Sequence, residues 1–226
     1  MARNADPIID FYERYPFPNN TVGLDIAIAS MRKLLHRHDH MRTVLAVGCG
    51  TGEELMALSA VLPHATISAI EPSTSSVQLA RERCPHSQIW NTTIEEFSGG
   101  QFDLVWCSGV LHHTKDPEGN LRRIREWVAP SGDVFVGLYH HARWDCMEVH
   151  EGHSDAQMRD TIMNPREVTY SWRAFIEMLK RSRLEPIRIW HKYRLPIPRG
   201  RIMQAAYDGL WLYRRIQMVS ALCRPI

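Results

Sequence analysis

The sequence predicts an α/β protein built on a doubly wound, mostly parallel sheet of about seven strands. Two observations carry this prediction. Between residues 43 and 139, short apolar segments typical of strands alternate with segments typical of helices. The first of these strands ends in three alternating glycines, and a helix follows at once. A length of 226 residues suits one domain with a single sizeable core.

The central elements each carry a local signal. Residues 43–47 form an apolar run that stops at glycine, which is typical of a strand buried on both faces. Leu55 and Leu58 stand at helical spacing, and Ser73 can cap the helix that follows it. In chain order we expect strands at 43–47, 65–70, 88–91, 102–107 and 134–139, helices at 53–62, 73–83 and 119–128, and a turn at 130–133.

The flanking segments depart from this rhythm. Residues 7–40 predict helical turns broken at Pro16 and Pro18, which would form a helical flap ahead of the first strand. Residues 140–165 are rich in His, Asp, Met and Asn, and they predict a long loop or insertion after the fifth strand. The remaining expectations are a helix at 171–183, a strand at 186–193, and a helix followed by an edge strand over 201–222.

Composition limits the classes of partner. The formal net charge is only +2, so there is no general field to hold nucleic acid or an anionic membrane. The N-terminus does not resemble a secretory signal, and no apolar run reaches about 18 residues, so we expect no membrane span. The five scattered cysteines form no CxxC pair. They favour free thiols in a cytoplasmic protein. Homo-oligomerisation is left open.

Two features at the ends of predicted strands point to a ligand. Gly48, Gly50 and Gly52 alternate directly after the first strand, where glycine lets the backbone approach a ligand closely. Glu71 ends the second strand, 19 residues after Gly52. Ligands of open α/β sheets sit at the carboxyl ends of the strands, and a carboxylate there can accept both hydroxyls of a ribose. The alternatives are a tight turn without a ligand and a solvated acid.

At these residues the sequence resembles the class I, Rossmann-like methyltransferases that depend on S-adenosylmethionine. The spacing Gly48-x-Gly50-x-Gly52 looks like the first motif of that family, and it differs from the dinucleotide pattern GxGxxG. The segment 103–113 with Asp116 and Pro117 resembles the fourth-strand motif, and residues 130–133 resemble the glycine turn before the fifth strand. The resemblance covers about residues 42–139.

The resemblance implies a set of residues that bind the cofactor. The glycine loop would wrap its methionine part, Glu71 would bind the ribose, and Ile94 would lie against the adenine. The Cys107 backbone would face the amino group. Relatives often have Asp at Thr93, so Thr93 or Glu95 would accept from the adenine amino group. The full set comprises Gly48, Cys49, Gly50, Thr51, Gly52, Glu71, Pro72, Thr93, Ile94, Cys107 and Ser108. S-adenosylhomocysteine would be the product.

The aromatic segment 11–18 resembles a YPYP-like segment found ahead of the first motif in a subset of bacterial methyltransferases. One interpretation is a lid, with Tyr12, Tyr15 and Phe17 over the site and Tyr139 on the substrate side. The other is a segment packed on the sheet edge. We therefore expect a single domain, 1–226, with a lid at 1–40, a cofactor-binding core at 41–139 and a substrate-side part at 140–226.

Several histidines follow predicted strands. His140 and His141 come directly after the fifth strand, and His113 comes after the fourth, so each is a candidate general base. A structural role is the alternative for each. His36, His38 and His40 precede the first strand and predict a surface run that faces away from the site. No standard zinc spacing occurs among the histidines and cysteines of 140–153, so we expect no metal.

The function predicted from these residues is methyl transfer from S-adenosylmethionine to a small-molecule acceptor, with oxygen favoured. Nitrogen or carbon acceptors, and RNA or protein substrates, are alternatives within the enzymes. The segment after the fourth strand holds Cys-Ser-Gly-Val where enzymes that methylate base amino groups carry Asn-Pro-Pro-Tyr. A cofactor-binding subunit without catalysis is the alternative from another class.

Overall fold

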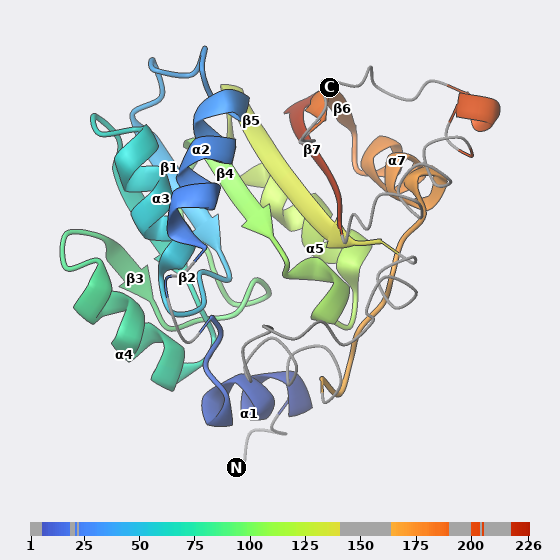
Figure 1. Cartoon of the computed structure of the whole chain (residues 1–226). Helices are drawn as coiled ribbons and strands as arrows, with labels where there is room; N and C mark the ends of the chain where they lie inside the picture. Colours follow the sequence, from blue (N-terminus) through green and yellow to red (C-terminus); the bar gives the residue numbers. More distant parts are fainter. Residues whose placement is uncertain are drawn as a thin grey trace.

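The computed structural model describes residues 6–18, 21, 23–140, 164–189, 200–203, 205 and 218–226. Its centre is a seven-stranded sheet with the order β3-β2-β1-β4-β5-β7-β6 (Figure 1). The strands are β1 (Thr43–Val47), β2 (Thr66–Ile70), β3 (Gln88–Trp90), β4 (Phe102–Ser108), β5 (Val128–Tyr139), β6 (Leu184–Ile189) and β7 (Met218–Pro225). The five strands β1 to β5 pair in parallel, whereas β7 runs antiparallel to its two neighbours, β5 and β6. The predicted fold class is confirmed.

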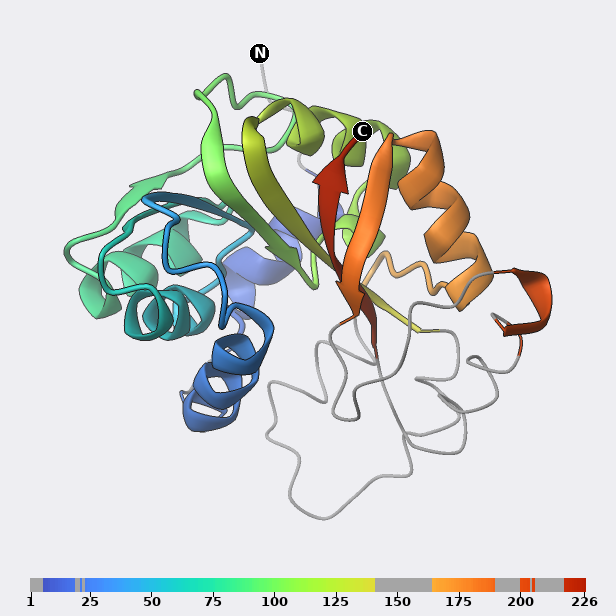
Figure 2. The ribbon, with the colours of Figure 1, turned by 90° about the horizontal axis from the view of Figure 1, so that it is seen from above.

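Helices cover both faces of the sheet, as Figure 2 shows with α2 and α3 on one side and α5 and α7 on the other. The described helices are α1 (Pro7–Arg14), α2 (Leu24–Leu34), α3 (Glu53–Val61), α4 (Thr74–Arg83), the 3-10 turn η1 (Leu111–His113), α5 (Pro117–Glu126) and α7 (Trp172–Arg181). Alternation along the strands divides the core. Trp106 and Phe135 face α2 and α3, whereas Val134 and Val136 face α5 and α7.

Side-chain caps set where α4 and α5 begin. Ser73 accepts from the Ser76 amide at 3.1 Å, as predicted. Asp116 accepts from the Gly119 amide at 2.8 Å, so α5 begins at Pro117, two residues before the predicted start. Such caps satisfy amides that have no partner in the first turn.

The prediction for β5 was too short. The strand begins at Val128 instead of residue 134, and the predicted turn lies inside it. Val128 pairs with Phe102 and Asp133 pairs with Leu104, so β5 carries three more residues than β4 over this stretch. These three extra residues of β5 form a bulge in its pairing with β4. A Cβ on Gly132 would lie 2.8 Å from the Asp103 carbonyl, which explains the glycine there.

The last strand was also predicted wrongly. β7 does not lie at the edge of the sheet, because it inserts between β5 and β6, and β6 is the edge strand. Its residues 219–223 are buried on both faces, which suits an interior position. β6 begins at Leu184 instead of residue 186. The rest of these two predicted segments falls largely on 190–199, 204 and 206–217, outside the described residues.

The predicted surface run of histidines is wrong for His38. His36 and His40 are exposed, but His38 is buried and its Nε2 lies 3.1 Å from Asp133 Oδ2. Arg224 donates to the other oxygen of Asp133 at 3.0 Å. Burial alone would raise the pKa of Asp133, but the hydrogen bonds from His38 and Arg224 outweigh it and hold the pKa below its usual value.

The N-terminal segment forms two helices interrupted at Pro16 and Pro18, as predicted. α1 lies at the end of the sheet where β1 and β4 finish, and it contacts α4 (Figure 1). None of the helices in the described ranges has the length and apolar character needed to cross a membrane.

Candidate active site

The glycine loop lies where the strand order reverses, between β1 and β4. Gly48, Gly50 and Gly52 have φ of 66°, 52° and 95°, a region that only glycine adopts readily. A Cβ on Gly48 would lie 2.5 Å from a Val110 methyl group, and one on Gly50 would collide with the carbonyl oxygen of Phe17. The loop therefore brings bare backbone to the crevice in which open α/β sheets hold their ligands.

Glu71 lies beside this loop and is held by main-chain amides. Its Oε2 accepts from the Gly50 amide at 3.0 Å, and its Oε1 accepts from the Ser73 amide at 3.0 Å. Burial raises the pKa of Glu71 to about 7, although these hydrogen bonds oppose the shift. A carboxylate has about four acceptor positions, so two remain. That capacity fits the two hydroxyls of a ribose.

The loops after β2 and β3 are tied together by a residue that the sequence analysis did not single out. The Asn91 side chain donates to the carbonyls of Glu71 at 3.0 Å and Pro72 at 2.9 Å. Thr93 caps the next turn, because its hydroxyl accepts from the Glu96 amide at 3.3 Å. Ile94 is buried in the core. The position of Asn91 next to the end of β3 gave no local signal in the sequence that it would bridge these two loops.

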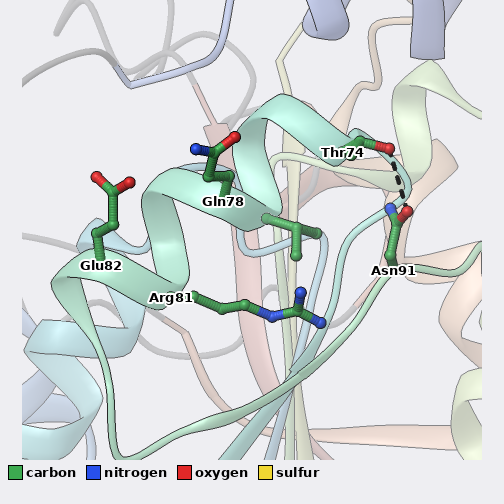
Figure 3. Close-up of a pocket in the computed structure, with 6 residues that line it drawn as sticks. Thr74, Gln78, Arg81, Glu82 and Asn91 are labelled. Carbon is green, nitrogen blue, oxygen red and sulfur yellow. Dashed lines mark hydrogen bonds between the residues drawn. The ribbon is translucent and has the colours of Figure 1, made fainter.

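Asn91, just after β3, also lines a hollow of about 480 Å³ beside α4, with Thr74, Val77, Gln78, Arg81 and Glu82 of that helix (Figure 3). The Thr74 hydroxyl donates to the Asn91 side chain at 3.1 Å, and the Arg81 guanidinium donates to the Ile89 carbonyl at 2.7 Å. The glycine loop and Glu71 do not line this hollow.

The cysteines of the predicted site are buried thiols. Cys49 lies within the glycine loop, and Cys107 is fully buried near the end of β4. Burial raises the pKa of both thiols far above the usual value, so they stay protonated at neutral pH. Ser108 ends β4, and Gly109 follows with φ of 74°. Any contribution of Cys107 to a ligand would therefore come through its backbone.

The aromatic segment is fastened to the glycine loop through its main chain. The Thr51 amide donates to the Phe17 carbonyl at 3.2 Å, and the Thr51 hydroxyl donates to the Pro18 carbonyl. Arg83 reaches the Thr51 carbonyl from α4 at 3.2 Å. Tyr15 packs on Phe11 with ring centroids 5.4 Å apart. The segment therefore lies directly over the loop.

A second attachment joins α1 to the start of α4. Glu13 accepts from the Ser73 hydroxyl at 2.8 Å and from the Ser75 amide at 3.2 Å. Burial alone would raise the pKa of Glu13, but these hydrogen bonds lower it overall. Asp6 pairs with Lys115 and with Arg166, each at 3.2 Å.

His113 is held by a chain of hydrogen bonds that fixes its tautomer. Its Nδ1 lies 2.8 Å from the Arg166 carbonyl, which can only accept, so Nδ1 carries the proton. In the neutral ring Nε2 then accepts from the Tyr12 hydroxyl at 3.3 Å. That hydroxyl accepts in turn from the Asn164 side chain at 3.1 Å. His113 Nε2 is thus an acceptor that the Tyr12 hydroxyl occupies, and its role as a general base stays a prediction.

Tyr139 belongs to the same group of rings, whereas His140 does not. The Tyr139 ring centroid is 3.8 Å from that of His112 and 5.7 Å from that of His113. Alternation along β5 places His140 on the face of Val136 and Leu138, which α5 and α7 cover, and it is fully buried. His141 lies outside the described residues.

Glu54 is a further acidic residue at the crevice, and it belongs to none of the motifs recognised in the sequence. It stands in the first turn of α3, two residues after Gly52, and its Oε2 accepts from the Trp106 indole at 2.8 Å. Burial raises its pKa to about 7, against the hydrogen bonds from Trp106 and Ser108. Within the described ranges, no cluster of three His, Cys, Asp or Glu side chains is arranged to hold a metal ion.

This geometry agrees with the comparison of the chain with known families. Residues 45–134 match a methyltransferase domain. The matched segment runs from β1 into β5, so it contains the glycine loop, Glu54, Glu71 and His113. The match covers 90 of the 226 residues and shows what this segment is similar to. The YPYP-like subset stays a prediction.

Curated relatives match the methyltransferase domain over part of their length. An uncharacterized protein of Synechococcus is 34% identical over 104 residues, which cover 42% of this chain and 25% of the relative. The ubiquinone biosynthesis O-methyltransferase of Escherichia coli is 34% identical over 101 residues, which cover 42% of this chain and 41% of the enzyme. The chain thus matches less than half of either relative.

Solved structures share the fold over nearly the whole chain. The methyltransferase bound to the Haloferax volcanii Trm112 methyltransferase activator is 15% identical, with a TM-score of 0.67 and coverage of 98% of this chain and 100% of that one. The plantazolicin methyltransferase BpumL, solved with a substrate analogue and S-adenosylhomocysteine, is 14% identical, with a TM-score of 0.65 and coverage of 96% and 89%. At these identities the likeness establishes the fold.

Proposed function

We propose that this protein transfers a methyl group from S-adenosylmethionine to an acceptor. One observation carries the proposal. The left-handed glycine loop after β1 donates a main-chain amide to the carboxylate of Glu71 after β2, next to the point where the strand order reverses and inside the segment that matches a methyltransferase domain. Gly48 and Gly50 adopt left-handed backbone that presents main chain to the crevice, and Glu71 keeps acceptor positions for ribose hydroxyls. The residues present therefore fit this cofactor.

The site supplies the groups that such a transfer needs. S-adenosylmethionine provides a methyl group on a positively charged sulfur, and the thioether that leaves needs no proton. For a hydroxyl acceptor the new bond joins carbon to oxygen, and the hydroxyl proton goes to His113 Nε2. The Arg166 carbonyl keeps the Nδ1 proton in place and so stabilises the charged ring that results. Tyr12, Tyr15 and Phe17 exclude water from above.

A small molecule accepting on oxygen is the substrate class that we favour. The relative from Escherichia coli is named an O-methyltransferase, and so is the mitomycin 7-O-methyltransferase MmcR, which shares the fold with a TM-score of 0.61 at 16% identity. The Tyr12 hydroxyl already donates to His113 Nε2, so a substrate hydroxyl would reach this base by taking the place of Tyr12. His140 and His141 stay predictions for the same role.

Other acceptors remain as alternatives to be tested. NodS of Bradyrhizobium japonicum, with a TM-score of 0.63, is named an N-methyltransferase. RNA and protein acceptors, and a cofactor-binding subunit without catalysis, are the other candidates. The structure with the Trm112 activator raises the case of a methyltransferase that needs a partner. The three-part division at 40 and 139, homo-oligomerisation and the cytoplasmic location stay predictions.

Two measurements test the proposal. Calorimetry with S-adenosylhomocysteine should show binding to the purified protein at one site. Incubation with a cofactor labelled in the methyl group and a cell extract should give a labelled small molecule, and the His113→Ala variant should bind equally well but label slowly. Absence of binding refutes the proposal. Binding without any labelled product, in extract or fractions, would favour the non-catalytic subunit.

A further inference from the structure

Glu54 reaches across the crevice from one side to the other. Glu54 lies in the first turn of α3, just after the glycine loop that follows β1. Its carboxylate accepts hydrogen bonds from Trp106 and Ser108 near the end of β4. The crevice between these two strands is the point where the strand order reverses. Positive-φ glycines stand on both sides of it, Gly52 after β1 and Gly109 after β4.

The carboxylate of Glu54 is held rigidly. The Trp106 indole donates to Oε2 at 2.8 Å, and Trp106 is itself fully buried and stacked on Phe135 with ring centroids 3.9 Å apart. The Ser108 hydroxyl donates from the same strand. Because the indole and the hydroxyl both belong to β4, the position of the carboxylate is fixed relative to the sheet.

The charge of Glu54 has no cationic partner among the residues that the structure describes. Glu53 is its neighbour and adds a second negative charge, and the nearby thiols of Cys49 and Cys107 are neutral. A partly buried carboxylate that lacks a cation is unfavourable, and its raised pKa expresses that. A hydrogen-bond acceptor for Trp106 alone would be served by a neutral Gln.

We propose that Glu54 binds the α-ammonium group at the methionine end of the cofactor. The inference depends on the proposed function. The glycine loop runs directly into the turn of α3 that carries Glu54, so the amino-acid end of a ligand lying on that loop comes to this carboxylate. Glu71 stands at the end of β2 on the other side of β1 and takes the ribose. The two carboxylates thus divide the ligand between them.

Two ligands and two variants separate the roles. S-adenosylhomocysteine carries the ammonium group, and 5′-methylthioadenosine carries the same adenosine and a thioether without it. Glu54→Gln should weaken S-adenosylhomocysteine about 10- to 100-fold, the usual effect of a charge-assisted hydrogen bond, and should change 5′-methylthioadenosine less than about twofold. The matched control Glu53→Gln removes the same charge one residue away, at a carboxylate bound to the Gly23 amide. It should change neither affinity more than about threefold.

The outcomes are distinct. If Glu54→Gln binds S-adenosylhomocysteine like the wild type, or weakens both ligands equally, Glu54 serves only to anchor Trp106 and the inference is overturned. If the wild type binds neither ligand, the proposed function fails instead. Should the variant not fold, the wild type still gives the answer. Between pH 8 and 6 its affinity for S-adenosylhomocysteine should fall about tenfold more than its affinity for 5′-methylthioadenosine, and equal falls would contradict the inference.

Discussion

Replacing Glu71 tests the centre of the site. The Glu71→Ala variant loses a charged acceptor of ribose hydroxyls, which is worth about 1.5–3 kcal/mol, so S-adenosylhomocysteine should bind roughly 10- to 150-fold more weakly. The variant also leaves the Gly50 and Ser73 amides without their hydrogen-bond acceptor. Gly50 is half-buried and water can replace the carboxylate there, but Ser73 is fully buried. We therefore expect a cost of about 1–3 kcal/mol in unfolding free energy.

That cost sets the change in thermal stability. An unfolding entropy of about 0.5 kcal/mol per kelvin for 226 residues gives a fall in Tm of about 2–6 °C. The Glu71→Gln variant keeps one carbonyl oxygen for these amides, so its Tm should fall less, although it also loses the negative charge. The comparison of the two variants thus separates binding from folding.

The pH dependence gives the sharpest form of this prediction. In the ligand-free protein the pKa of Glu71 is raised to about 7. Because ribose hydroxyls donate to the ionised form, affinity should rise with pH up to 7 and level off above about 8, and at pH 6 it should be about tenfold weaker. A folded-state pKa above the unfolded value means that the folded state binds more protons between about pH 4.5 and 7. Stability from this group therefore decreases as pH rises through that window.

Calorimetry with 5′-methylthioadenosine at pH 6, 7 and 8 isolates this effect, since that ligand does not engage Glu54. The wild type should show the slope and Glu71→Gln should not. An equal affinity at all three pH values, or an unchanged slope in Glu71→Gln, would remove the ribose assignment.

Three further predictions follow from the structure. His113→Ala should reduce turnover about 10²- to 10⁴-fold without changing affinity for S-adenosylhomocysteine, whereas the buried His140→Ala should act mainly on Tm; near-normal turnover of both across pH 6–9 would argue against a base at either position. Deleting residues 1–18 should abolish transfer while circular dichroism still reports a folded core, and proteolysis near Arg14 should slow when S-adenosylhomocysteine is added; full turnover of the truncated protein would reduce the segment to a packing role. Asp133→Ala should lower Tm by about 2–6 °C, since it breaks a buried pair with His38. The lowered pKa of Asp133 means that this stabilisation is present above about pH 4 and is lost as pH falls further, so a Tm difference that persists unchanged at pH 2–3 would contradict it.

Local signals in the sequence predicted most of the sheet and the left-handed glycine loop after β1. The apolar run of β1, the glycines after it and the acid after β2 each depend on neighbours a few residues away, and so does the Ser73 cap. These features can be recognised in isolation because buried parallel strands and left-handed turns restrict composition strongly.

Features that depend on distant pairing were not predictable in this way. The place of β7 between β5 and β6 is set by antiparallel pairing with strands far away in the sequence. His38 meets Asp133 across 95 positions, and Tyr12 meets His113 across 101. Acidic residues are common in the first turn of helices, where Glu54 stands. The sequence therefore gave no sign that Glu54 accepts a hydrogen bond from Trp106.

The fastening of the aromatic segment has a consequence for how acceptor preference can change. The two groups that Thr51 grips are the carbonyl oxygens of Phe17 and Pro18, which every amino acid possesses. The side chains of Tyr15 and Phe17 take no part in that grip. New side chains can therefore be tried at these two positions without removing either hydrogen bond. If the segment is the lid that we propose, a library confined to positions 15 and 17 would vary substrate selectivity while this attachment is kept.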